Sequence, residues 1–291
     1  MRKLVLIDFS WLYNKYYYVA LQNVSLNIEQ SSKGAEGLKE VLEQMLFQFL
    51  GHVEKSYPKV YLVLDSELSS AKNKEIFEGY KGNRDKEAKK EVYRFISEII
   101  KDLAHKLNPK VFYFVREKFH EADELLAYLA KKFYEKFEII IFSGDKDLLQ
   151  LTSFPNVFIS DKFEKGKFII KTDDEIFLKF KNSRGEDFSR ISTNKRDILK
   201  YRSLKGDNSD NLSAVFPRIK DKEIVEIIKN YWLDDQEEPL TEVRIEKILE
   251  DLGGDNFELA NKLRESKEVW LRNYKIMDLL HVEDINVRRL V

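Results

Sequence analysis

The chain has 291 residues, of which 43% are hydrophobic and 35% charged, a balance typical of a folded protein with a heavily charged surface. No apolar run approaches the roughly 18 residues that span a bilayer, and the first residues lack the cleavage site of a signal peptide. The absence of cysteine excludes disulfides, cysteine-ligated zinc and a thiol nucleophile, and it fits a cytoplasmic protein.

The first part of the chain alternates between short apolar runs and segments with helical spacing of apolar residues. This alternation predicts a parallel α/β sheet flanked by helices. We expect a hairpin formed by residues 157–160 and 167–171. We interpret the aromatic run from Trp11 to Tyr18 as packing rather than as a base-stacking platform. The predicted strands are residues 3–8, 60–64, 111–115 and 138–142, and the predicted helices are 37–53, 91–107 and 122–137.

The strand signal fades after about residue 173. Helical spacing predicts helices over residues 194–204, 220–232, 242–252 and 257–280. We therefore predict two domains, an α/β domain over residues 1–184 and a helical domain over residues 185–291.

Carboxylates follow each of the four predicted strands. In an open parallel sheet, the carboxyl ends of the strands meet at one edge, where ligands bind. A further pair of carboxylates lies where the helical region begins. The strand-end residues are Asp8, Asp65, the group Glu121, Asp123 and Glu124, and the pair Asp145 and Asp147; the later pair is Asp207 and Asp210.

So many carboxylates in one place would repel one another unless cations lay among them. Oxygen ligands favour magnesium or manganese over zinc, and two such ions form the clamp used in phosphoryl displacement. Any single one of these acids could be a helix N-cap or turn residue, and Glu121 with Glu124 could simply favour a helix N-terminus. Their occurrence at four strand ends favours a metal site.

The net charge of −1 conceals an uneven distribution of charge. If nine of the 51 acidic residues surround metal ions, 42 remain against 50 basic residues, which leaves about +8 on the rest of the surface. Residues 72–94 contain eight basic residues against five acidic ones, with Phe77 and Tyr80 between them. Such a segment suits a nucleic-acid strand, because charges follow phosphates while rings stack on bases. A solvated helix face with mixed charges is the alternative.

Six motifs in this order resemble those of the 5′-nuclease family, which includes flap endonucleases, the 5′-exonuclease domains of bacterial DNA polymerases and phage 5′ exonucleases. Within that family, the chain is most similar to the RNase H branch of T-even phages. The resemblance covers most of the chain and is strongest over residues 4–212. The motifs are Leu-Ile-Asp-Phe-Ser (6–10), Val-Leu-Asp-Ser (63–66), Tyr-Lys-Gly-Asn-Arg (80–84), Glu-Ala-Asp-Glu (121–124), Ser-Gly-Asp-Lys-Asp (143–147) and Lys-Gly-Asp-Asn-Ser-Asp-Asn (205–211).

The resemblance implies a PIN-like sheet, a basic arch at about residues 66–94 and a helix–three-turn–helix-like region that binds duplex. It implies two Mg²⁺ ions, for which Mn²⁺ can substitute. The first ion would be served by Asp8, Asp65, Glu121, Asp123 and Glu124, and the second by Asp145, Asp147, Asp207 and Asp210. Lys81 and Arg84 would hold the scissile phosphate and stabilise developing charge.

One segment departs from the family pattern. Residues 212–220 contain no glycine, whereas the family has a glycine-rich hairpin there that grips duplex phosphates and helps to bind a potassium ion. We therefore expect no potassium site and expect duplex contacts to pass to basic side chains. The full expected nucleic-acid surface is Lys72, Lys74, Tyr80, Lys81, Arg84, Lys86, Arg218, Lys220 and Lys222.

The predicted function is metal-dependent hydrolysis of DNA or RNA–DNA duplexes from 5′ ends, with 5′-phosphate products. The resemblance further implies a monomer that acts in DNA replication or primer removal, in the host cytoplasm if the source is a phage, with a single-strand-binding protein as a partner. Two alternatives stay open. A PIN-type ribonuclease on single-stranded RNA would share the acidic cluster, and a structure-specific DNA-binding protein that no longer cuts would have lost ligands, whereas all nine positions are acidic.

Overall fold

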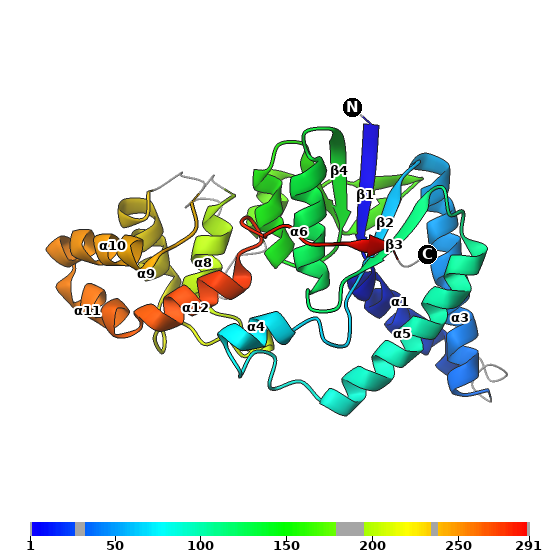
Figure 1. Ribbon diagram of the computed structural model, residues 1–291, viewed down its shortest axis with the longest axis horizontal. Helices are drawn as coiled ribbons and strands as arrows, with labels where there is room; N and C mark the ends of the chain where they lie inside the picture. The colour runs from blue at the N-terminus through cyan, green and yellow to red at the C-terminus, as the bar shows by residue number, and fades with distance from the viewer. Residues whose placement is uncertain (1, 27–32, 179–194, 234–237, 290–291) are drawn as a thin grey trace.

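The computed structural model describes residues 2–26, 33–178, 195–233 and 238–289, and its centre is a six-stranded sheet (Figure 1). The strand order is β5-β4-β1-β2-β3-β8, with five parallel strands and an antiparallel β8 at one edge. The predicted parallel α/β fold is thereby confirmed. The strands are β1 (Arg2–Asp8), β2 (Val60–Leu64), β3 (Phe112–Arg116), β4 (Phe137–Phe142), β5 (Val157–Ser160) and β8 (Arg288–Arg289).

Helices cover both faces of the sheet. Successive side chains of a strand point to opposite faces, so Val5 and Ile7 pack on one side and Leu4 and Leu6 on the other. The first face is covered by α1, α3 and α5, and the second by α6 and η1. Their bounds are α1 (Phe9–Leu26), α3 (Ala35–Ser56), α5 (Lys86–Lys106), α6 (Ala122–Phe133) and the 3₁₀ helix η1 (Asp147–Ser153).

The register of the sheet aligns the ends of its strands. Asp8 at the end of β1 pairs with Val63 of β2, and Leu64 pairs with Arg116 of β3. On the other side of β1, Ile7 pairs with Phe142, the last residue of β4. Residues that follow these strands therefore emerge at the same edge of the sheet.

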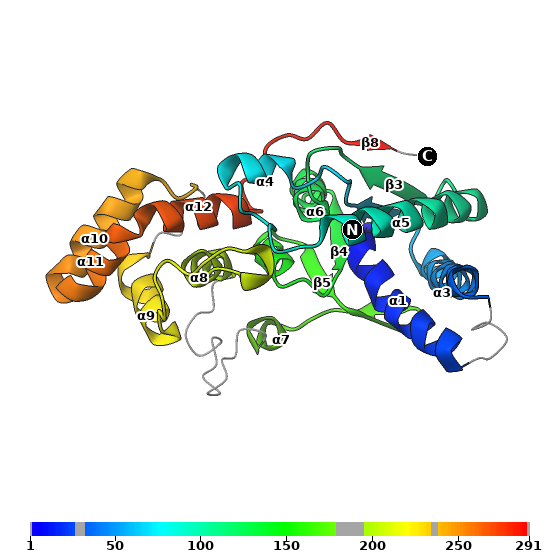
Figure 2. The same ribbon diagram turned by 90° about the horizontal axis from the view of Figure 1, so that it is seen from below.

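The remaining helices form a second region beside the sheet, which Figure 2 shows from below. Its apolar core is continuous with that of the sheet face covered by α6, and Trp270 of α12 is fully buried in it. The short helix α4 (Ala71–Ile76) lies beside α12. The helices are α7 (Asp173–Leu178), α8 (Asp197–Lys205), η3 (Asn208–Asp210), α9 (Asp221–Glu226), the π-helical η4 (Ile227–Tyr231), α10 (Glu242–Asp255), α11 (Phe257–Glu265) and α12 (Lys267–Met277).

Three details differ from the sequence prediction. Strand β5 pairs in parallel with β4 because Val157 and Ile159 are buried in the core, and the hairpin is formed instead by β6 (Lys162–Glu164) and β7 (Lys167–Ile169). The predicted helix 257–280 is two helices that meet at Ser266, which ends α11 and begins α12.

The third difference is β8, which leaves the helical region and returns to β3. The prediction that the chain stays helical from about residue 185 onward is therefore wrong for this last segment. The predicted boundary between residues 184 and 185 lies outside the described residues. Of the helices described, none is both long and apolar enough to cross a membrane.

Candidate active site

The edge at which the strands end contains a cavity of about 560 Å³, which we call the acidic cavity. The carboxylates predicted at the strand ends converge there, with one exception described below. Four basic side chains also line it, namely Lys81, Arg84, Lys146 and Arg202. The eight carboxylates that line it are Asp8, Asp65, Glu121, Asp123, Asp145, Asp147, Asp207 and Asp210.

Two of these carboxylates are held by donors at the start of helices. The backbone N–H of Trp11, in the first turn of α1, donates to Asp8 Oδ1 at 2.9 Å, and Ser143 Oγ donates to Asp8 Oδ2 at 2.8 Å. The backbone N–H of Ala122, at the start of α6, donates to Asp65 Oδ1 at 2.9 Å. Helix N-termini present unpaired N–H groups and a positive dipole end, so both carboxylates are oriented by the fold itself.

Burial and mutual repulsion favour the protonated form of the carboxyls at the sheet edge. Burial, together with the charges of Asp65 and Asp145, raises the pKa of Asp8 to about 7 against the hydrogen bonds from Trp11 and Ser143. The pKa of Asp123 lies well above its usual value through burial and through the charges of Asp145, Asp8 and Asp65. A divalent cation would offset both effects by favouring the ionised oxygen atoms.

Asp147 lies at the junction between the sheet and the helical region. Arg202 of α8 donates from Nε to Asp147 Oδ1 at 2.7 Å and from Nη2 to Asp147 Oδ2 at 3.2 Å. The same Nη2 donates to Asp207 Oδ2, so one guanidinium bridges two carboxylates. Burial raises the pKa of Asp147 to about 6 even though Arg202 opposes this shift.

The carboxylates of the helical region are presented by a tight loop over residues 206–212. Gly206 has φ 73°, and a Cβ atom there would lie 2.5 Å from the carbonyl oxygen of Leu212. Asp207 and Leu212 exchange two backbone hydrogen bonds of 2.8 Å, which close the loop. Burial acts to raise the pKa of Asp207, but hydrogen bonds from Ser209 and the charge of Arg202 outweigh it and lower that pKa.

The predicted phosphate-binding residues are docked on these acids. Lys81 Nζ lies 2.7 and 2.8 Å from the two carboxylate oxygens of Glu121, and Arg84 Nη2 lies 2.5 Å from Asp210 Oδ1. The backbone N–H of Lys81 donates to the carbonyl of Asp210 at 2.9 Å. Lys81 also has φ 52°, a conformation that costs a non-glycine residue energy and is enriched at functional sites.

The interpretation of Tyr80 as a base-stacking residue is wrong for this structure. Its ring is 3% exposed and belongs to the core beside α6, so no base can stack on it. Its hydroxyl donates to Glu121 Oε2 at 2.8 Å and lies 3.2 Å from Asp210 Oδ2. Tyr80 therefore orients two carboxylates instead of contacting nucleic acid.

Glu124 is the one predicted ligand that does not line the acidic cavity. Its Oε2 accepts a 2.8 Å hydrogen bond from the backbone N–H of Glu121, which forms a capping box at the start of α6. The alternative given above, in which Glu121 and Glu124 favour the helix N-terminus, is thus observed as this capping box.

The other predicted basic residues lie on two surfaces. Lys72 and Lys74 are half-buried on α4, and Lys72 Nζ lies 3.7 Å from Glu283. The side chain of Lys86 lies outside the described part of the chain. The glycine-free segment is anchored by the buried side chains of Leu212, Val215 and Ile219. Three exposed cations surround the start of α9, namely Arg218, Lys220 and Lys222.

Sequence reasoning missed two residues that position the loop. Arg202 is one of three basic residues of α8 and lies five positions before Asp207, and this proximity was the available signal. Asn273 of α12 is fully buried, and its Nδ2 donates to the carbonyl oxygens of Ser203 and Ser213 at 3.1 and 2.8 Å. Nothing in the sequence near Asn273 indicates that it brackets a loop 60 residues away.

The donor set of the acidic cavity suits hard divalent cations. Its ligand atoms are carboxylate oxygens, and burial without a cation nearby raises the pKa of both Asp8 and Asp123. As the described side chains stand, no three acidic or histidine residues enclose a metal-sized position, because Lys81, Arg84 and Arg202 lie among the carboxylates. These cations neutralise the same oxygens that a metal ion would bind.

Comparison with known proteins places this geometry in a family. The 5′-3′ exonuclease N-terminal resolvase-like domain matches residues 3–181. A 5′-3′ exonuclease of Aquifex aeolicus (strain VF5) is 28% identical over 256 residues, which cover 84% of this chain and 75% of that protein. A 5′-3′ exonuclease of Mycoplasmopsis pulmonis (strain UAB CTIP) is 26% identical over 284 residues, which cover 95% and 80%.

Solved structures of phage T5 enzymes share the fold. The T5 5′-exonuclease with bound zinc superimposes with a TM-score of 0.62 and 19% identity, over 96% of this chain and 90% of that one. The T5 flap endonuclease in complex with DNA and metal ions gives a TM-score of 0.60 and 19% identity, over 96% and 89%. The match of the family domain over more than half of the chain shows that the chain belongs to the 5′-3′ exonuclease family and is a nuclease.

Proposed function

We propose that this nuclease uses two Mg²⁺ ions to hydrolyse phosphodiester bonds near the 5′ ends of flap, nicked and 5′-ended duplex DNA and of RNA–DNA hybrids, leaving 5′-phosphates. The observation that carries the proposal is the acidic cavity, where eight carboxylates meet beside Lys81 and Arg84. Phosphoryl transfer needs positioning and charge stabilisation more than a protein nucleophile, and this cavity offers both.

The resemblance to the family suggests two groups of carboxylates. Those around Asp8 and Asp65 would hold one ion, and those around Asp147 and Asp207 the other. Oxygen ligands favour Mg²⁺, with Mn²⁺ as a substitute. When bound, the ions would make a water molecule more acidic and offset negative charge on the phosphate. The proposed first group is Asp8, Asp65, Glu121 and Asp123, and the proposed second group is Asp145, Asp147, Asp207 and Asp210.

Lys81 and Arg84 supply the contacts of the protein itself to the scissile phosphate. Both already bind carboxylate oxygens at 2.5–2.8 Å, so their charged groups lie directly beside the carboxylates of the cavity. A phosphate oxygen is an equivalent acceptor for either group, and arginine can bind it with two donors. Arg84 is the more exposed of the two, with 46% of its side chain accessible against 13% for Lys81. We assign Arg84 to capture of the phosphate and Lys81 to stabilisation of charge at the bond that breaks.

Contacts to the duplex would come from outside the acidic cavity. Arg218, Lys220 and Lys222 are exposed near the start of α9 and can follow a phosphate backbone without base specificity. Their spacing along one segment supports a role in holding the duplex while its 5′ end reaches the acids. Cleavage of hybrids and flaps suits removal of RNA primers in DNA replication, and we include that process in the proposal. The proposal also includes a monomeric protein that is located in the cytoplasm and has a single-strand-binding protein as a partner.

A comparison of substrates tests the function. A 5′-labelled flap, a nicked duplex, an RNA–DNA hybrid and a single-stranded RNA are each incubated with Mg²⁺ and with chelator. We expect cleavage of the first three with Mg²⁺ only, and products that a 5′-phosphate-dependent exonuclease can degrade. Cleavage of single-stranded RNA alone would favour the PIN-type ribonuclease, and binding of flaps without cleavage at saturating Mg²⁺ would favour a DNA-binding protein.

A further inference from the structure

Lys81 lies in a turn over residues 79–84, which we call the lysine turn. The backbone N–H of Gly82 donates to the carbonyl of Gly79 at 2.9 Å, and the N–H of Arg84 donates to the carbonyl of Lys81 at 3.3 Å. A Cβ atom at residue 82 would lie 2.9 Å from the carbonyl oxygen of Gly79, so the turn needs glycine there. Because Lys81 has φ 52°, its conformation persists only where surrounding contacts hold it. Those contacts therefore determine the position of its side chain.

Two asparagine side chains hold the lysine turn on the loop over residues 206–212, which we call the acid loop. Nδ2 of Asn211 in the acid loop donates to the carbonyl of Gly79 at 2.7 Å, although the two residues are 132 positions apart in the chain. In the opposite direction, Nδ2 of Asn83 in the lysine turn donates to the carbonyl of Asn208 at 3.1 Å. Each segment thus donates an amide hydrogen bond to the backbone of the other.

The residue type at position 211 fits this contact. Asn211 is in the left-handed conformation, with φ 61° and ψ 29°. Glycine, asparagine and aspartate are the residues that adopt this conformation at the lowest cost. Of these three, only asparagine has a side-chain N–H donor. Residue 211 therefore combines the backbone shape that ends the acid loop with the amide that reaches the lysine turn.

These amide contacts differ from the ion pairs of the lysine turn. Lys81 binds Glu121 and Arg84 binds Asp210, and both carboxylates belong to the proposed metal sites. Metal ions and a phosphate would therefore take over these ion pairs. The two amide contacts use no charged group, and neither does the 2.9 Å hydrogen bond from the N–H of Lys81 to the carbonyl of Asp210. Uptake of ions and phosphate leaves all three hydrogen bonds their donors and acceptors.

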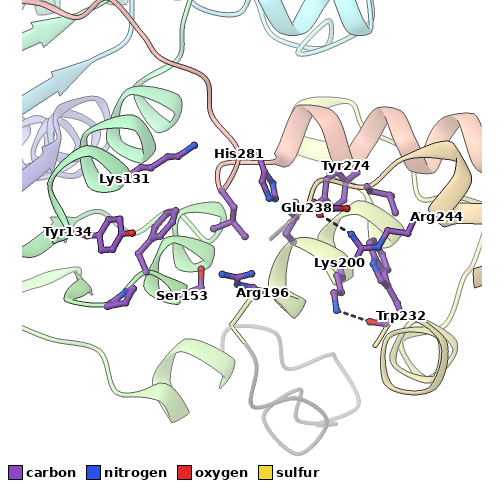
Figure 3. A pocket seen from close by; sticks show the side chains of 15 residues that line it. Lys131, Tyr134, Ser153, Arg196, Lys200, Trp232, Glu238, Arg244, Tyr274 and His281 are labelled. Atoms are coloured by element: carbon purple, nitrogen blue, oxygen red, sulfur yellow. Dashed lines mark hydrogen bonds between the residues drawn. The ribbon is translucent and has the colours of Figure 1, made fainter. Parts of the chain in front are cut away.

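The acid loop is itself fixed to the helical region. Helix α8 leads into the loop, and Lys200 of α8 donates from Nζ to the carbonyl of Trp232 at 2.7 Å (Figure 3). Just before the lysine turn, the ring of Phe77 lies 4.2 Å from the guanidinium carbon of Arg272 in α12, a cation–π contact. The lysine turn is therefore fastened to segments that pack in the helical core.

We propose that Asn211 and Asn83 are positioning residues for Lys81, which hold the lysine turn on the acid loop so that the ammonium group reaches the scissile phosphate. This inference rests on the proposed function, because it takes the assignment of Lys81 to that phosphate from there. Neither asparagine lines the acidic cavity, so each acts through Lys81 and not on the reacting atoms.

Cleavage rate and DNA affinity, measured separately, test this role. Asn211→Gly keeps the left-handed backbone and removes the amide, so single-turnover cleavage of a labelled flap with Mg²⁺ should slow about tenfold. The dissociation constant for the same flap in Ca²⁺ should stay unchanged. Asn83→Ala, at an exposed residue of the other segment, should give a smaller loss of the same kind, because its hydrogen bond is longer.

Asn156 provides the matched control. It also has a positive φ, of 62°, and its Nδ2 donates to the carbonyl of Tyr134 at 3.3 Å, outside the acidic cavity. Asn156→Gly removes the same kind of contact and adds the same backbone freedom. It should leave both the cleavage rate and the dissociation constant unchanged.

A double variant separates positioning from a general structural effect. In a Lys81→Ala protein, adding Asn211→Gly should slow cleavage by less than about twofold, because no ammonium group remains to be positioned. Three results would overturn the proposal: an unchanged rate in Asn211→Gly, the same tenfold loss with and without Lys81, or a loss of DNA affinity as large as the loss of rate.

Hydrogen exchange in chelator tests the contact without DNA or metal ions. Backbone amides of a peptide that spans residues 79–84 should exchange about fivefold faster in Asn211→Gly and at the wild-type rate in Asn156→Gly. If the wild-type protein cleaves flaps but the Asn211 variant matches it in exchange and in rate, only this proposal fails. If the wild-type protein cleaves no flap, the proposed function fails, and exchange still shows whether the amide holds the turn.

Discussion

The acidic cavity has two halves, one formed by the strand ends and one by the loop after α8, and their carboxylates are stabilised by different groups. In the half formed by the strand ends, Asp8 and Asp65 accept hydrogen bonds from backbone N–H groups and a hydroxyl, and burial raises the pKa of Asp8 to about 7. In the half formed by the loop after α8, Arg202 bridges Asp147 and Asp207, and the pKa of Asp207 is lowered. Burial therefore favours protonation of Asp8 in one half and of Asp147 in the other, but only the second half has a guanidinium between its carboxylates.

This difference predicts two kinds of competition for a divalent cation. At the strand ends, a cation would compete with protons, so its affinity should depend steeply on pH. At the loop, it would compete with Arg202 and Arg84, whose charges persist at any pH at which the protein is folded. The two proposed ions therefore meet different competitors, since arginine side chains lie among the carboxylates of the second half and not of the first.

The largest effect is expected from removal of charge in the strand-end half. Asp8→Asn keeps the shape of the side chain but removes an ionisable oxygen that we assign to a metal ion. Cleavage should fall at least about a thousandfold, while the metal-free protein becomes more stable because a buried acid with a raised pKa is gone. Cleavage rates and thermal unfolding in chelator at pH 8 check both parts. Unchanged cleavage at saturating Mg²⁺ would refute the assignment of Asp8.

Lys81 is expected to affect chemistry more than binding. Lys81→Ala removes the positive charge that we propose stabilises the scissile phosphate during cleavage. Cleavage at saturating substrate should therefore slow by roughly a hundredfold. The dissociation constant for flap DNA in Ca²⁺ should change much less. Lys247→Ala, at an exposed cation of α10 outside the cavity, is the matched control and should leave the rate nearly unchanged. Equal losses in binding and in rate for Lys81→Ala would contradict its role at the reacting phosphate.

A substitution at Arg202 tests the loop half independently of the strand-end half. Arg202→Gln leaves Asp147 and Asp207 without their shared cation, and breaking a buried pair of this kind costs roughly 3 kcal/mol. The loss should be seen in the unfolding of the protein in chelator and should shrink with Mg²⁺, which can replace the guanidinium. Arg264→Gln on the exposed face of α11 controls for a general effect of losing an arginine. An equal loss of stability with and without Mg²⁺ would count against this competition.

Stability of the metal-free protein should depend on pH in a defined direction. The folded-state pKa values of Asp8, about 7, and of Asp147, about 6, lie above the unfolded value of 3.8. Their contribution to stability is full below pH 3.8 and is lost as pH rises through 6 and 7. The melting temperature in chelator should therefore fall by several degrees between pH 5 and pH 8, and Mg²⁺ should remove the decline. A melting temperature that rises over this interval would contradict the raised pKa values.

The smallest effect is expected at Glu124. Glu124→Gln keeps an acceptor for the N–H of Glu121, so the capping box and cleavage should both persist. Asp123→Asn, one residue away and inside the acidic cavity, should abolish cleavage. Loss of Mg²⁺ affinity in the Glu124 variant would restore its assignment as a metal ligand.

The sequence predicted what depends on local pattern and on parallel pairing. Short apolar runs that end in acids gave β1, β2 and β4 within a residue or two, and parallel pairing then required Asp8, Asp65 and Asp145 to converge. The helix α1 was not predicted, because aromatic residues lie all around it, with Tyr13 buried, Tyr17 partly buried and Tyr18 exposed, and so give little amphipathic contrast.

Contacts between distant segments explain most of what the sequence did not predict. Tyr80 is interspersed with basic residues as a stacking ring would be, and only the fold shows that its hydroxyl reaches Glu121, 41 residues away. The sequence around Asn273 does not distinguish it from other polar residues of α12, and only the fold shows that its amide donates to the carbonyl oxygens of Ser203 and Ser213. Glu124 required the choice between a capping acid and a ligand, which is decided by side-chain direction and not by spacing.

The short strand β8 also bears on the solubility of the protein. It pairs antiparallel with β3, whose Phe112, Phe114 and Val115 are buried. A shortened chain that lacks residues 288–291 would remove the pairing of β8 with Val115 and Arg116 and so expose the end of this strand edge. Unpaired edges of apolar strands are templates for pairing between molecules. Such a truncation should therefore favour self-association during expression and storage, even if the acidic cavity stays intact.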